Sequence, residues 1–178
     1  MKKASLLLSL LLLAGCTNGG TSNGGSGSSK SVAVKDAVDA AYATVLEENK
    51  VPSMEMDKDT VISYFSLDDS IVKDAYGIGP MMSAHIDMIV AIETAKPSDA
   101  AIIEGIMETY QENLENDSMQ YPMNLAAISE AEVFSEGNYV YYVRLNTYTS
   151  DDLSDDQRAE VIEKINDKAE EAIETLHK

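Results

Sequence analysis

The chain of 178 residues carries 31 Asp and Glu against 13 Lys and Arg, so its formal net charge at pH 7 is −18. Such acidity argues against nucleic acid as a partner and against adsorption to anionic lipid, because both need clustered Lys and Arg. The length suits one domain with a sizeable core. Cys16 is the only cysteine. No internal disulfide can form, so packing must stabilise the fold.

The first residues have the pattern of a secretory signal peptide. Two lysines precede the apolar run Leu6–Leu13, which is much shorter than the ~20 residues that span a bilayer. Leu13-Ala14-Gly15-Cys16 resembles the lipobox of bacterial lipoproteins. This resemblance implies cleavage after residue 15 and a diacylglycerol on Cys16, with palmitate among its acyl chains, on the outer face of the cell membrane. Two acyl chains anchor a protein stably where one is marginal. An ordinary cleaved signal with a chance cysteine is the alternative.

The stretch behind Cys16 predicts a tether. Residues 17–31 are almost all Gly, Ser, Thr and Asn, a composition that behaves as a flexible coil with a reach of roughly 20 Å. We therefore predict three parts: a signal peptide over 1–15, a lipidated cysteine and tether over 16–31, and one globular domain over 32–178. Residues 1–15 hold two basic residues and no acidic one, so the mature chain would carry a net charge of −20.

The first third of the domain has helical patterns. Apolar residues at helical spacing predict a helix from Val34 to Leu46, which ends before Val51-Pro52. Ser66-Leu67-Asp68-Asp69 matches a capping box and predicts a short helix through Ala75. The Gly- and Pro-rich stretch Tyr76–Pro80 predicts a turn.

Strand patterns begin at Ala84–Thr94, where apolar residues alternate with a second face that holds His85 and Asp87. An amphipathic helix is predicted behind Ser98, to about Glu115, and a polar connection over 116–124. Two strands, Ala131–Ser135 and Asn138–Asn146, flank a turn at Glu136-Gly137-Asn138, and a capping box at Ser154 opens a long helix to Leu176. These elements predict an α+β fold, in which helices pack on one face of a small antiparallel sheet of about three strands.

The order of several short motifs resembles a known family. Tyr76-Gly77-Ile78, the strand Ile89–Thr94, Tyr121-Pro122 and the hairpin around Gly137-Asn138-Tyr139-Val140 resemble short lipoproteins of Gram-positive bacteria that share domain of unknown function 4358. The resemblance covers about residues 35–146. It implies the α+β arrangement and the surface location, but no activity and no site residues. The acidic helix Ser154–Leu176 departs from the family and either packs on the domain or projects from it.

Few residues offer catalytic chemistry. His85 and His177 are the only histidines, whereas nucleophilic catalysis needs Ser or Cys beside a base and zinc needs three or four ligands. We therefore predict no enzyme and no cofactor beyond the lipid. Asp68-Asp69 and Asp151–Asp156 could offer oxygen ligands to calcium, but neither matches an EF-hand loop. Asp155 and Asp156 have a simpler explanation, because acids in the first turn of a helix are stabilised by the positive end of the helix dipole.

The tyrosines of the last strand suggest an interaction surface. Tyr139 and Tyr141 share one strand face, and Tyr142 and Arg144 share the other. We expect the first pair inside and the second on an open sheet face, with His85 or Asp87 as neighbours, because Tyr and Arg are enriched at interfaces. Ordinary strand propensity of tyrosine is the alternative.

The favoured function is a lipid-anchored, non-enzymatic interaction module, whose partner is another envelope protein. Its predicted surface is the open sheet face, with Tyr142 and Arg144, or the acidic C-terminal helix. On this interpretation Tyr142→Ala and Arg144→Ala would barely change the stability. The alternative function is binding of a small soluble ligand, such as a cation, a peptide or a glycan.

Overall fold

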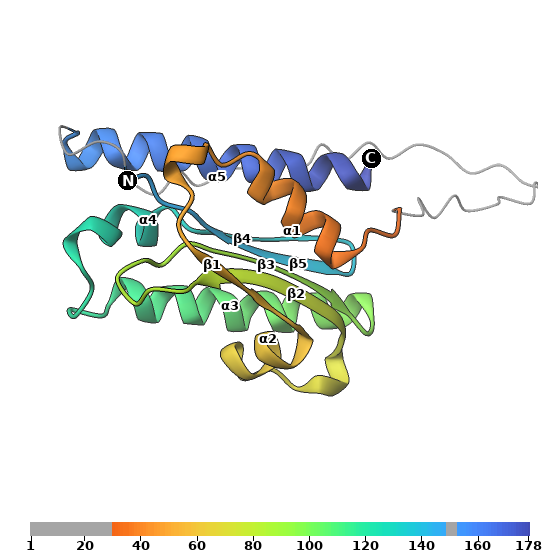
Figure 1. Cartoon of the computed structure of the whole chain (residues 1–178). Helices are drawn as coiled ribbons and strands as arrows, with labels where there is room; N and C mark the ends of the chain where they lie inside the picture. The colour runs from red at the N-terminus through yellow and green to blue at the C-terminus, as the bar shows by residue number, and fades with distance from the viewer. Residues whose placement is uncertain (1–29, 149–152) are drawn as a thin grey trace, which may run out of the picture.

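The computed structural model describes residues 30–148 and 153–178, which form three layers, an antiparallel sheet between two layers of helices (Figure 1). Cys16, most of the predicted tether, and Asp151 and Asp152 lie outside the described residues. The main elements are α1 (Val34–Ala43), β1 (Ser53–Met56), α2 (Lys58–Phe65), β2 (Val72–Pro80), β3 (Met88–Thr94), α3 (Ala100–Glu115), α4 (Leu125–Ser129), β4 (Glu132–Glu136), β5 (Tyr139–Arg144) and α5 (Asp155–His177). Four 3-10 turns are η1 (Glu47–Asn49), η2 (Asp69–Ile71), η3 (Pro97–Asp99) and η4 (Pro122–Asn124).

The sheet has five strands in the order β1-β2-β3-β5-β4, two more than the sequence predicted. The central strand β3 pairs Ala91 with Tyr76 of β2 on one side and with Tyr141 of β5 on the other. The β4–β5 hairpin is confirmed, and Gly137 takes a positive φ of 64° at its turn, a conformation that glycine adopts without strain.

The additional strands are β1, for which the sequence predicted no strand, and β2, which comes from the stretch that was predicted to be a helix and a turn. Ser66 does not open a helix; it ends α2 in the left-handed conformation, and Val72–Pro80 is a strand. A Cβ on Gly77 would lie 2.9 Å from Val90 Cγ2 and 3.0 Å from the Ile89 carbonyl oxygen. The glycine therefore permits close approach of β2 and β3 and does not mark a turn, which corrects the prediction.

One face of the sheet is covered by α1 and α5. Val38 of α1 and Ile173 of α5 are fully buried in a core with Ile89, Tyr141 and Leu145. The capping box that was predicted for α5 is present, since Ser154 Oγ accepts from the Gln157 amide and Gln157 Oε1 accepts from the Ser154 amide. The long C-terminal helix therefore packs on the domain along its length (Figure 1).

The opposite face is covered by α2 and α3. Val61 of α2 and Ile103 of α3 are fully buried against Val90 and Tyr142. Helices thus pack on both faces, which contradicts the prediction that one face is open. The physical reason lies in β3, where Met88–Ile92 is an unbroken buried run, typical of a strand that is covered on both sides.

No helix within residues 30–148 and 153–178 combines the length and the apolar composition needed to cross a membrane.

Candidate interaction surface

Tyr142 and Arg144 lie in the core and not on an open face. The Tyr142 side chain is fully buried and Arg144 is 2% exposed. Tyr142 Oη donates to Gln111 Oε1 at 2.7 Å, and Arg144 Nη1 donates to Tyr142 Oη at 2.7 Å. Arg144 Nε donates to the Ile86 carbonyl oxygen at 2.9 Å. The predicted interaction surface is therefore wrong for both residues, because α3 covers this side of β5.

The Arg144 guanidinium is buried among aromatic rings. Its carbon lies 5.7 Å from the Tyr110 ring centroid and 5.3 Å from that of Tyr142. Across the described ranges, no carboxylate lies within 4.0 Å of this guanidinium. A buried charge without a partner is costly, so the aromatic faces and the hydrogen bonds must compensate it. Arg144 therefore helps to hold α3 on the sheet.

His85 and Asp87 lie in the loop that precedes β3, whereas the sequence predicted them within the strand. The His85 ring meets the Tyr148 ring edge to face, with centroids 4.5 Å apart. Asp87 accepts from the Asn146 amide at 3.0 Å and from the Tyr148 hydroxyl. Burial raises the pKa of Asp87 above its ordinary value. Both residues therefore contact the segment behind β5, where their partners are Tyr148 and Asn146 and not the predicted Tyr142 or Arg144.

Two fully buried amides extend this contact to a third segment. Asn124 Nδ2 donates to the Ala84 carbonyl oxygen at 3.0 Å, and Asn146 Nδ2 donates to the Met123 carbonyl oxygen at 3.1 Å. These bonds join the loop 81–87, the segment 116–131 and the strand end 145–148, which we call the loop end of the molecule. Buried polar groups that are bonded in this way fix the backbone around them.

Large apolar side chains are exposed on this frame. They are Met119 (85% exposed), Met81 (65%), Tyr121 (54%), Leu125 (53%), Met82 (46%) and Met123 (44%), and we call them the apolar surface. Pro122, Leu125 and Ala126 also form one side of a groove whose other side carries Asp155 and Asp156. Large apolar side chains that are exposed on neighbouring segments are candidates for an interaction site, and methionine adapts readily to a partner.

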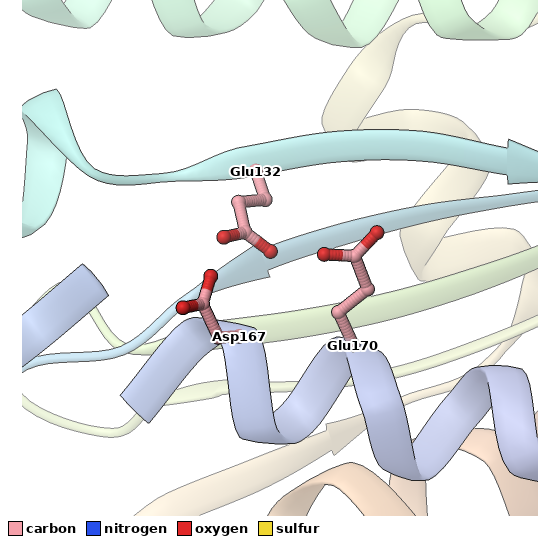
Figure 2. Close-up of side chains that lie close together, drawn as sticks. All are labelled: Glu132, Asp167 and Glu170. Carbon is pink, nitrogen blue, oxygen red and sulfur yellow. The ribbon is translucent and has the colours of Figure 1, made fainter. Parts of the chain in front are cut away.

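A group of three carboxylates lies elsewhere, between β4 and α5. Figure 2 shows Glu132 of β4 pointing toward Asp167 and Glu170 of α5, and carboxylate oxygens of the three lie within 4.8 Å of one another. Glu132 Oε2 is buried without a hydrogen-bond partner. Burial and the nearby charges of Glu170 and Asp167 raise the pKa of Glu132 to about 8, so this group holds a proton at neutral pH. Carboxylate oxygens also suit Ca²⁺ or Mg²⁺.

The acidic clusters that the sequence offered for calcium have other contacts. Asp68 accepts from the Ser70 amide, and Asp69 forms an ion pair with Lys58 at 2.8 Å. Asp155 and Asp156 lie in the first turn of α5, as predicted. The group around Glu132 was missed. The available signal was Glu132, a charged residue at an inward position of β4, together with Asp167 and Glu170, which are three residues apart and so lie on one face of a helix.

The apolar surface was also missed by sequence reasoning, which treated residues 116–124 as a polar connection. The available signal was the alternation of Met119, Tyr121, Met123 and Leu125 with Gln120, Pro122 and Asn124. Ser70 and Lys73 have the spacing of a Ser-x-x-Lys nucleophile motif. Lys73 Nζ, however, forms an ion pair with the Glu93 carboxylate at 2.6 Å, at the exposed end of β2.

Comparison with protein-family models finds a match to most of the sheet and its helices. The family described as Domain of unknown function (DUF4358) matches residues 46–145, which is more than half of the chain. The chain belongs to this family. The DUF4358 match spans all five strands together with α2, α3 and α4, whereas α1 and α5 lie outside it. It contains most of the loop end. Searches of curated proteins and of solved structures found no match.

Proposed function

We propose that this DUF4358 protein is a lipid-anchored, extracytoplasmic interaction module without catalytic activity, and that its partner is another protein of the cell envelope. The observation that carries the proposal is the apolar surface at the loop end. Six large apolar side chains, from 44% to 85% exposed, are presented there on a frame of buried hydrogen bonds. A rigid frame lowers the entropy that is lost on binding.

The polar side chains of the sheet support this proposal because their hydrogen bonds are made within the domain. Arg144 and Tyr142 hold α3, and Asp87 holds the strand end, so each has partners within the domain. The N-terminal pattern that ends in Cys16 supports attachment to the outer face of the membrane. A strongly acidic surface then keeps the domain soluble and away from anionic lipid.

Two measurements test the proposal. Metabolic labelling with palmitate should mark the wild-type protein but not Cys16→Ala, and the variant should leave the membrane fraction. Amine-reactive cross-linking in the membranes of the producing organism should then capture one reproducible envelope protein, identified by mass spectrometry. Labelling of Cys16→Ala at the wild-type level would refute the anchor. Absence of any partner for the anchored protein would favour a soluble ligand instead.

A further inference from the structure

The surroundings of the apolar surface are acidic. No lysine or arginine occurs between Lys96 and Arg144, a stretch that includes α3 and the segment 116–131. Glu115 and Asp117 are exposed there, and Asp117 accepts from the Met119 amide at 2.9 Å. The groove beside Leu125 adds two exposed acids of α5, together with Arg158, whose Nη1 donates to the Thr147 carbonyl oxygen. An apolar centre with acids around it is complementary to an apolar patch ringed by cations.

The loop end lies opposite the point where the described chain begins. Val32 donates to Tyr139 Oη, beside the β4–β5 turn, whereas the loop end adjoins the other end of β5 (Figure 1). Between them runs α5, whose 23 residues span roughly 34 Å. The apolar surface thus lies at the end of the domain opposite Val32.

We propose that the apolar surface docks on an envelope protein whose own contact surface has an apolar centre and a rim of lysine and arginine. This inference rests on the proposed function. Anionic lipid is a poor occupant because the surrounding acids repel it. A second copy of this chain would bring two acidic surfaces together, which costs binding energy.

Site-specific photo-crosslinking tests the location. A benzophenone amino acid is placed at Leu125 or, as a matched control, at Ile102 of α3, since both side chains are 53% exposed. In membranes of the producing organism, Leu125 should yield a cross-link to one envelope protein at least tenfold more often than Ile102. Mass spectrometry should place it on a peptide that holds apolar residues beside Lys or Arg. Cross-links mainly to lipid, to a second copy or from Ile102 would overturn the inference.

Charge reversal tests the chemistry of the partner. Glu115→Lys with Asp117→Lys should lower the cross-link yield at least tenfold, and added salt should lower the wild-type yield. The control reverses two exposed acids at the far end of α5, Glu171→Lys with Glu174→Lys, and should stay within twofold of the wild type. Equal yields from both double variants would refute the basic rim. If wild type captures a partner but not through Leu125, only this inference fails; if wild type captures none, the proposed function fails as well.

Discussion

Glu132→Gln is expected to stabilise the protein at alkaline pH and to change little at acidic pH. The pKa of Glu132 rises from 4.5 to about 8 on folding, because of burial and the charges of Glu170 and Asp167. The folded state therefore holds this proton more tightly than the unfolded chain does. The contribution to the free energy of unfolding is fully present below about pH 4.5 and is lost as the pH rises through about 8.

The magnitude follows from the size of the pKa shift. One pKa unit corresponds to about 1.4 kcal/mol, so the whole shift would be worth about 5 kcal/mol in a dry site. Water reaches part of the Glu132 side chain and screens its neighbours, so we expect about 1–2 kcal/mol. A glutamine at this position is neutral at every pH, and its amide can donate to Asp167 or Glu170. At pH 9 the variant should therefore unfold about 2–8 °C above the wild type.

The assay is urea or thermal unfolding of both proteins at pH 5 and at pH 9. Glu163→Gln serves as the control, since Glu163 is an exposed acid of the same helix α5, and its pH dependence should follow the wild type. Equal stability of Glu132→Gln and wild type at both pH values would refute the buried proton. A variant that is less stable than wild type at pH 9 would show instead that a cation compensates the Glu132 charge.

Other substitutions test the two-sided packing of the sheet. Tyr142→Ala should lower the free energy of unfolding by about 3–5 kcal/mol. Tyr142→Phe should lower it by about 1–3 kcal/mol, because Gln111 Oε1 loses its donor and Arg144 Nη1 loses an acceptor. A loss below about 0.5 kcal/mol for Tyr142→Ala in urea titration would indicate an open sheet face. Gly77→Ala should destabilise by about 1–3 kcal/mol because its Cβ meets Val90. Gly105→Ala, in α3 with nothing within 4 Å of an added Cβ, should gain about 0.5–1 kcal/mol; thermal unfolding of the two glycine variants should give shifts of opposite sign.

Much of the architecture was predictable because local signals and tertiary structure agree. The periodicity of α1, α3 and α5, the Ser154 capping box and the turn at Gly137 are local features, and the structure confirms each. The strand β2 was not predictable in this way. Its Gly77 and Gly79 indicate a turn when only neighbouring residues are considered, whereas their reason lies in Val90 and Met56 on adjacent strands.

The candidate site was predicted less well, because burial depends on what covers each face. Tyr142 and Arg144 have the composition of an interface, and only the position of α3 shows that they are core residues. His85 and Asp87 were predicted beside Tyr142 and Arg144, whereas they contact Tyr148 and Asn146 at the end of β5. The apolar surface itself combines separate segments that the sequence gives no means of placing together.

Hydrogen–deuterium exchange tests the central claim most directly. The lipidated protein is compared in native membranes and after purification into phosphatidylglycerol vesicles, which lack other envelope proteins. If a partner covers the loop end, amides of 81–87 and 116–131 should exchange at least tenfold more slowly in native membranes, while α3 around Ile102 and the C-terminal half of α5 remain unchanged. Identical exchange at the loop end in both preparations, or protection confined to other segments, would contradict an interaction module that binds through this surface.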